Sequence, residues 1–331
     1  MAVNKQIVLD SRPADKVAAS HFRSVEAPMP KAGEGEFVMR QHYLSLDPYM
    51  RGRLSDAKSY ARPQEIGAVM GGGSVGEVVE SKNPKFKVGD FVVGPGGWQQ
   101  FAKSDGAGWN VVDARYIPLQ AYVGVVGMPG ATAWYGLNEI IKPKAGETVV
   151  VSAASGAVGG VVGQLAKLKG AKVVGIAGGK EKCGYVRDEL GFDACVDHKS
   201  AHFGDEMKAA LSGGVDGLFE NVGGEPFLQS LKRLNDFARI AICGLIASYE
   251  AAPTVLPDMR IFLVRRIKIE GFIVSDHLDV WPRALAEIGG LVTSGKLKYR
   301  ETVRNGLEAA PQGLVDLLSG GNFGKMLVKL V

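Results

Sequence analysis

The spacing of apolar and polar residues changes near residue 125. Before that point, short β-branched runs alternate with proline and glycine turns, a pattern that predicts a β-rich region. Strands are expected there at 6–10, 36–45, 74–81 and 90–94. After that point, buried-strand patterns alternate with helical ones, which is typical of a parallel sheet whose strands are joined by helices.

The second region is predicted to be a doubly wound parallel α/β sheet of the Rossmann type. Its strands are expected at 147–152, 172–177, 194–197, 215–221, 238–244 and 267–274, with helices at 156–169, 181–190, 202–211 and 225–235. Beyond about residue 300 the sequence returns to a strand, a helix at 307–318 and a final strand at 325–331. We therefore predict a substrate domain of residues 1–125 plus 300–331, into which a dinucleotide-binding domain of residues 126–299 is inserted.

The turn after the first strand of the second region has the pattern of a phosphate-binding turn. A glycine turn lets the backbone approach a pyrophosphate, and the following helix N-terminus presents free N–H groups. Apolar positions from Val158 to Leu168 recur at helical spacing, so a helix follows the turn. The residues expected to hold the cofactor here are Ser155, Gly156, Ala157, Val158 and Gly159. The first glycine of the usual G-x-G-x-x-G pattern is missing, so an ordinary helix–sheet packing turn remains the alternative.

The end of the next strand predicts which dinucleotide binds. An NAD site needs an acidic residue there to hold the ribose 2′-hydroxyl. This chain has Gly178 and Gly179, followed by Lys180, Glu181 and Lys182. We expect NADP(H), with Gly179 and Lys182 at the 2′-phosphate; the alternative is that these lysines are only a solvated helix start.

Charge and cysteine content indicate which partners and which cellular compartment to expect. The formal net charge of +4 over 331 residues is slight, so charge gives no reason to expect a nucleic-acid partner. Three cysteines favour a reducing compartment over a disulfide framework. We expect a cytoplasmic protein, because the N-terminus has no signal-peptide pattern and the most apolar window, 121–137, is broken by glycine and proline.

Blocks of sequence along the whole chain resemble zinc-independent medium-chain reductases of the prostaglandin reductase, alkenal/one double-bond reductase and curcumin reductase group. The matching blocks are 45–51, 128–133, 151–159, 220–224, 243–244 and 270–274. The resemblance implies a GroES-like, barrel-like first domain. It also implies NADPH-dependent reduction of the carbon–carbon double bond of α,β-unsaturated aldehydes and ketones. Members of the group are commonly homodimers, which here would join through the edge strand near 267–274.

Enone reduction requires hydride delivery to the β-carbon and a donor for the negative charge that develops on the carbonyl oxygen. Tyr249, just past a strand end, is the first candidate for that donor, and lining the pocket is its alternative role. Tyr49 is the second candidate, in the Asp-Pro-Tyr-Met-Arg motif of the group. Arg51 is expected either to contact the cofactor or a carboxylated substrate, or to hold its loop to Asp47.

The resemblance assigns further residues to the cofactor site. Besides Tyr249, they are Met128, Thr132, Asn221, Cys243, Gly244, Phe272, Ile273, Val274 and Asn322. Core packing is the alternative for Met128, and turn formation is the alternative for both asparagines. Several relatives have a tyrosine after the third strand, where this chain has His198, so His198 or Lys199 is expected at the adenine end.

Zinc is not expected, because no cysteine precedes Cys183 and the five histidines lack ligand spacing. Two other functions remain open. One is NADPH:quinone oxidoreductase activity on the same fold, and the other is a non-catalytic dinucleotide or RNA binder. The sequence does not identify the physiological substrate.

Overall fold

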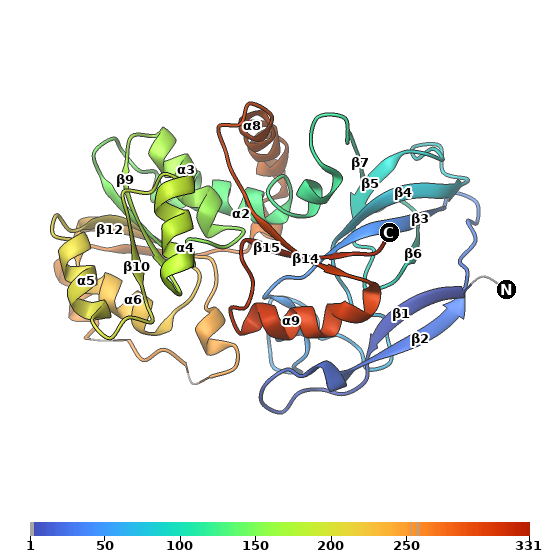
Figure 1. The fold of residues 1–331 in the computed structure, drawn as a ribbon, viewed down its shortest axis with the longest axis horizontal. Coiled ribbons are helices and arrows are strands. Elements are labelled where there is room, and N and C mark those ends of the chain that lie inside the picture. The colour runs from blue at the N-terminus through green and yellow to red at the C-terminus, as the bar shows by residue number, and fades with distance from the viewer. Residues whose placement is uncertain (1–2, 252, 257) are drawn as a thin grey trace. The chain divides into compact units, whose positions relative to one another are not determined.

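The structure, a computed structural model, describes residues 3–251, 253–256 and 258–331. The chain divides into two compact units. Unit 1 is Met1–Gly124 with Glu301–Val331, and unit 2 is Val125–Arg300 (Figure 1). Within the described ranges, no helix is long and apolar enough to cross a membrane.

Unit 1 is built on a mostly antiparallel sheet. In its described part, six of the seven strands follow the order β14-β15-β3-β4-β5-β7, the seventh, β6, also pairs with β3, and β1 and β2 pair separately. These strands are β1 (Val3–Leu9), β2 (Phe22–Pro28), β3 (Phe37–Ser45), β4 (Ser74–Ser81), β5 (Phe91–Gly94), β6 (Phe101–Ser104), β7 (Asn110–Val112), β14 (Glu301–Asn305) and β15 (Lys325–Lys329). Its helices are α1 (Met50–Arg53) and α9 (Ala310–Leu318).

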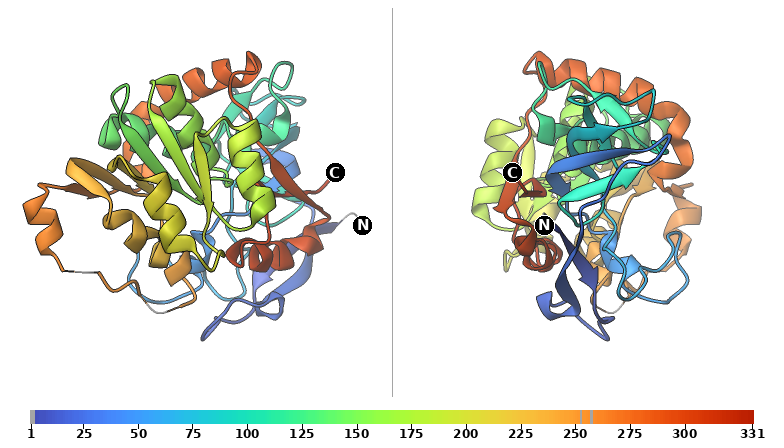
Figure 2. Two further views of the ribbon diagram at one scale, coloured as in Figure 1. Left: turned by 60° about the vertical axis from the view of Figure 1, so that its left-hand side comes forward. Right: turned by 90° about the vertical axis from the view of Figure 1, so that its right-hand side faces the viewer.

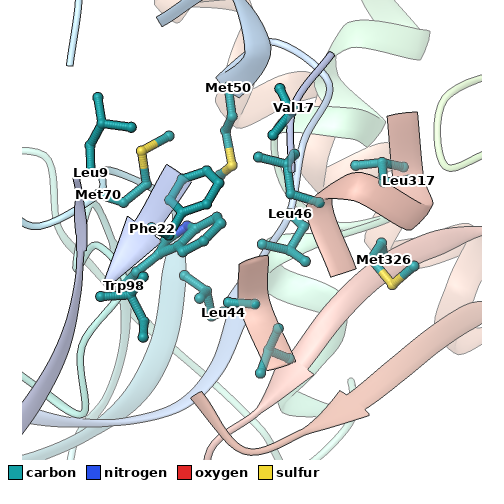
Figure 3. Packing of buried hydrophobic residues seen from close by; sticks show 14 of the residues in the cluster. Leu9, Val17, Phe22, Leu44, Leu46, Met50, Met70, Trp98, Leu317 and Met326 are labelled. Atoms are coloured by element: carbon teal, nitrogen blue, oxygen red, sulfur yellow. The ribbon is translucent and has the colours of Figure 1, made fainter. Parts of the chain in front are cut away.

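One apolar core joins the two ends of the chain within unit 1. Figure 3 shows Phe22 and Trp98 stacked at its centre, with ring centroids 5.2 Å apart. Leu46 and Met50 are at most 1% exposed in the same cluster, which also includes α9. Because these two residues flank positions 47–49, the core fixes both ends of the segment that carries Tyr49.

Unit 2 contains a six-stranded parallel sheet in the described ranges, with the order β10-β9-β8-β11-β12-β13. Its strands are β8 (Thr148–Ser152), β9 (Lys172–Ala177), β10 (Ala194–Asp197), β11 (Val215–Glu220), β12 (Leu234–Ile242) and β13 (Lys268–Gly271). Its helices are α2 (Met128–Tyr135), α3 (Gly159–Leu168), α4 (Lys180–Gly184), α5 (Phe203–Ala210), α6 (Gly224–Leu231), α7 (Arg260–Val264) and α8 (Trp281–Thr293).

Helices cover both faces of this sheet because its strands are apolar on both faces (Figures 1 and 2). Val150, Val174 and Leu218 share a buried cluster with α5 and α6. Phe219, the next residue along β11, points to the other face, where a β-carbon on Gly136 would meet its ring at 2.4 Å. The π-helical turn that continues α2, Gly136–Ile141, packs against that face.

The predicted fold class, a doubly wound parallel sheet with a separate β-rich domain, is confirmed. Several details differ from the prediction. The helix after β8 begins at Gly159 rather than 156, and Leu168, expected on its buried face, is 56% exposed. The last strand of the sheet, expected at 267–274, ends at Gly271 because the chain turns into a 3-10 helix, Val274–Val280. Strands β2, β6 and β7 and helix α8 were not predicted.

Candidate active site

A pocket of about 420 Å³ opens at the carboxyl ends of β12 and β13. This is the edge of a doubly wound sheet at which ligands bind. Its lining is Ile242, Cys243, Gly244, Leu245, Tyr249, Gly271, Phe272, Ile273, Asp276 and His277. The structure therefore brings together several residues assigned to the cofactor site, which come from two separate segments of the sequence, 242–249 and 271–277.

Tyr249 is the predicted donor that lies in this pocket. It is half-buried, and its hydroxyl lies 3.6 Å from the position that a β-carbon on Gly244 would take. Burial raises the pKa of Tyr249, although a hydrogen bond from the Leu245 backbone opposes the shift. The phenol is therefore protonated at neutral pH and can donate a hydrogen bond to a ligand.

The predicted phosphate-binding turn has the close backbone packing that a dinucleotide requires. Ala153 has a φ of +49°, and the Gly156 N–H donates to its carbonyl oxygen at 2.9 Å. A β-carbon on Gly159 would lie only 2.4 Å from that same oxygen. A β-carbon on Gly163, one turn into α3, would lie 1.8 Å from the Phe192 ring, so α3 lies close to its neighbours. Glycine is needed at both positions, and the turn leads into the N-terminus of α3, which fits a pyrophosphate.

Cationic side chains gather at the ends of β9 and β10, where the 2′-phosphate was predicted. Burial and the neighbouring Lys199 lower the pKa of Lys182. A β-carbon on Gly178 would lie 2.8 Å from His198 Nε2. The Asp197 carboxylate is hydrogen-bonded to the backbone, because its Oδ1 accepts from the Gly179 N–H at 2.8 Å. The group fits a phosphate better than a bare ribose hydroxyl, because the cations of Lys182 and Lys199 lie close enough to repel each other, while the Asp197 carboxylate is bonded to the backbone.

Some predicted residues use their polar groups for local structure. Thr132 Oγ1 donates to the Met128 carbonyl at 2.7 Å within α2. The side-chain amide of Asn221 donates to the Ser152 carbonyl at 2.8 Å, and that of Asn322 donates to the Gly324 carbonyl at 2.6 Å. The Asn322 contact lies within its own turn, as expected from turn formation, whereas the Asn221 contact joins the ends of β11 and β8.

The two site candidates of the substrate domain lie in unit 1. Tyr49 is half-buried, and burial raises its pKa, although the neighbouring Arg53 opposes the shift. Arg51 Nη2 donates to the Asp15 carbonyl at 2.8 Å. Asp47, the suggested partner of Arg51, pairs instead with Lys325 at 3.2 Å.

Sequence reasoning missed two buried polar residues beside the pocket, Glu220 and Ser152. Both are 0% exposed, and Ser152 Oγ donates to Glu220 Oε1 at 2.8 Å. Each is the last residue of a mostly apolar strand, and a polar residue at such a carboxyl end is the signal that could have identified them.

A metal site is not apparent in the described residues, which contain no group of three or more His, Cys, Asp or Glu side chains able to hold an ion. The three cysteines are free thiols. Burial raises the pKa of the Cys243 thiol to about 12, so this pocket residue is neither an anion nor a nucleophile at neutral pH.

Two family descriptions match the chain: "N-terminal domain of oxidoreductase" over residues 5–112 and "Zinc-binding dehydrogenase" over residues 157–289. The NADPH-dependent curcumin reductase of Escherichia coli (strain K12) is 45% identical, over 99% of this chain and 97% of its own. The NADP-dependent 2-alkenal reductase of Nicotiana tabacum is 38% identical, over 98% and 97%.

A solved structure is similar over the same length. The crystal structure of CurA from Vibrio vulnificus in complex with NADPH is 45% identical, covers 99% of both chains and superposes with a TM-score of 0.94. Identity of this size over nearly whole chains shows common family membership as well as a common fold. The chain therefore belongs to the zinc-independent medium-chain dehydrogenase/reductase group that contains the curcumin, 2-alkenal and prostaglandin reductases.

Proposed function

We propose that this protein is an NADPH-dependent reductase of the carbon–carbon double bond of α,β-unsaturated aldehydes and ketones. The observation that carries the proposal is the pocket at the ends of β12 and β13, in which a protonated tyrosine faces an otherwise mostly apolar wall. Whole-length relatives with reductase activities named for curcumin and 2-alkenals support the same substrate class.

The bound cofactor supplies the hydride that goes to the substrate β-carbon. Tyr249 donates a hydrogen bond to the carbonyl oxygen, on which negative charge develops. A preorganised donor of this kind contributes roughly 3–4 kcal/mol to the transition state, or two to three decades in rate. Tyr49 and Arg51 contribute to binding the substrate in this proposal, and no metal takes part.

The cofactor is held, we infer, by backbone groups at its pyrophosphate and its nicotinamide, and by side chains at its 2′-phosphate. The turn of residues 155–159 and the N-terminus of α3 bind the pyrophosphate, while Lys182, with His198 or Lys199, binds the 2′-phosphate. Backbone groups of 272–274 bind the nicotinamide carboxamide, and Cys243 and Gly244 form the adjacent wall. The remaining residues assigned by resemblance, Met128, Thr132, Asn221 and Asn322, complete the site.

The test is to follow NADPH consumption with a medium-chain 2-alkenal, an aryl butenone and a simple quinone, and to identify the products. We expect the saturated aldehyde and ketone, with far lower efficiency when NADH replaces NADPH. Tyr249→Phe should lower kcat by about two decades, because it removes the donor and keeps the ring. Reduction of the quinone alone would favour the quinone oxidoreductase alternative. NADPH binding without any turnover would favour the non-catalytic binder.

We also propose a cytoplasmic homodimer joined through β13, the edge strand of the unit 2 sheet. Apolar side chains are exposed on and near this strand: Ile269 is 42% exposed, Val264 64% and Leu263 78%. An apolar sheet edge is a ready site for pairing with a second copy. Light scattering should give twice the mass of the chain, and a monomer mass at micromolar concentration would contradict the proposal.

A further inference from the structure

A buried carboxyl group stands directly beside the pocket. Glu220 is the last residue of β11 and is 0% exposed. One of its oxygens, Oε1, accepts three hydrogen bonds, from Ser152 Oγ at 2.8 Å, the Val222 N–H at 2.6 Å and the Gly223 N–H at 2.8 Å. The other, Oε2, is buried and has no hydrogen-bond partner among the described residues. A single oxygen atom therefore fixes the turn that follows β11.

The turn at 221–223 is hydrogen-bonded to residues 246 and 247, which lead to Tyr249. The carbonyl of Asn221 accepts from the Ile246 N–H at 3.2 Å, and the carbonyl of Val222 accepts from the Ala247 N–H at 2.9 Å. The Tyr249 N–H then bonds the Ile246 carbonyl at 3.2 Å. Any displacement of the turn is transmitted to Tyr249 through these backbone bonds.

Glu220 also ties together the ends of three neighbouring strands. Its side chain is bonded to Ser152, the last residue of β8, and its backbone carbonyl accepts from the N–H groups of Cys243 and Gly244, which follow β12, at 2.9 and 3.1 Å. Ser152 Oγ accepts from the Asn221 N–H at 2.8 Å. In the sheet, β8, β11 and β12 are consecutive, and the connections change direction at β8, where ligands bind in doubly wound folds.

We propose that Glu220 is a positioning residue of the reductase, which sets the turn at 221–223 through Oε1 and thereby places Tyr249 and Asn221 for the reaction. This inference rests on the proposed function in one respect, the reaction in which Tyr249 takes part. What Glu220 provides is the location of an acceptor oxygen, and its charge is not needed.

The uncharged form follows from its surroundings. If the carboxyl group were ionised, half of its negative charge would lie on Oε2. That atom is buried and has no hydrogen-bond donor among the described residues, so the ionised form is unfavourable. Burial raises the pKa of Glu220, against the opposing effect of the three hydrogen bonds at Oε1. A neutral amide oxygen at the same place should therefore do the same work.

The experiment compares Glu220→Gln with Glu220→Asp. Glutamine keeps an acceptor oxygen at full reach without a charge, whereas aspartate keeps the carboxyl but withdraws it by one methylene. We expect kcat of the Gln variant to stay within about threefold of wild type. We expect kcat of the Asp variant to fall at least tenfold, by more than any change in KM for the acceptor. Leu211→Ala, a buried apolar change elsewhere in unit 2, is the control for lost stability alone and should keep wild-type kcat.

The affinity for NADPH is a second readout of Glu220 that does not depend on turnover. The dissociation constant for NADPH, measured by fluorescence without an acceptor, should rise severalfold in the Asp variant only. It tests Glu220 even if wild type reduces none of the enones, an outcome that would overturn the proposed function by itself. Wild-type kcat and NADPH affinity in the Asp variant, or an inactive Gln variant beside an active Asp variant, would overturn the positioning role.

Discussion

Two buried carboxyl groups, one in each unit, anchor the segments that carry the two candidate tyrosines, but they are stabilised differently. Asp47 lies two residues before Tyr49, is 5% exposed and forms an ion pair with Lys325, itself 4% exposed, at 3.2 Å. Glu220, 0% exposed, anchors the segment of Tyr249 and meets three neutral donors but no cation.

The difference lies in what each group needs in order to remain buried. The Lys325 ammonium also donates to the Leu46 carbonyl at 2.5 Å and to the Met326 carbonyl at 3.0 Å, and Ser45 donates to Asp47. The pair therefore satisfies two charges at once, and each charge depends on the other. Glu220 can remain buried by staying protonated. Removing one partner should consequently be far more costly in unit 1 than neutralising the carboxyl in unit 2.

The largest expected effect is that of Lys325→Met. It leaves Asp47 as a buried charge without a counter-ion, which typically costs about 3–5 kcal/mol. The free energy of unfolding, measured by urea denaturation of the purified protein, should fall by that amount. KM for the enone should also rise, because the segment from Asp47 to Tyr49 loses its link to β15. A loss below about 1 kcal/mol would mean that the ion pair does not hold this segment.

This pair could not be predicted from the sequence, although the fold could. The strand patterns predicted all six parallel strands of unit 2, five of them to within three residues at each end, while β12 begins four residues before its predicted start. They could be predicted because buried strands are short apolar runs with glycine turns at their ends. The pairing of Lys325 with Asp47 joins residues 278 positions apart in the chain, and no local pattern encodes it. Asn221 shows the limit at the site, since its motif marked the turn but not the Ser152 carbonyl that it bonds.

A smaller effect is expected when both charges are removed together. In Asp47→Asn/Lys325→Met, the asparagine oxygen still accepts from Ser45, and neither position of the pair carries a charge. Replacing both members of a buried ion pair is often close to neutral, so the double variant should recover about 2 kcal/mol or more of the loss seen in Lys325→Met. A double-mutant cycle with Asp47→Asn completes the measurement. Losses that simply add would show that the two side chains act independently.

The smallest effect is the pH dependence contributed by Glu220. Because burial raises its pKa in the folded state, the folded protein binds this proton more tightly than the unfolded chain does. Its contribution to stability is therefore fully present below the unfolded pKa and is lost as pH rises through the folded pKa. Glu220→Gln lacks this titration, so its Tm relative to wild type should increase from pH 5 to pH 8.

The comparison between the two proteins at each pH removes the titration of every group that they share. Cys243 is a titratable neighbour of Glu220. Burial raises the pKa of its thiol to about 12, so the thiol stays neutral throughout this pH range. Each unit by which the folded pKa exceeds the unfolded one contributes about 1.4 kcal/mol once the carboxyl has ionised in both states. A Tm difference that is constant from pH 5 to pH 8 would show that Glu220 does not titrate in that range. A difference that decreases with pH would show a carboxylate stabilised as an ion, as in unit 1, and would end the contrast between the two anchors.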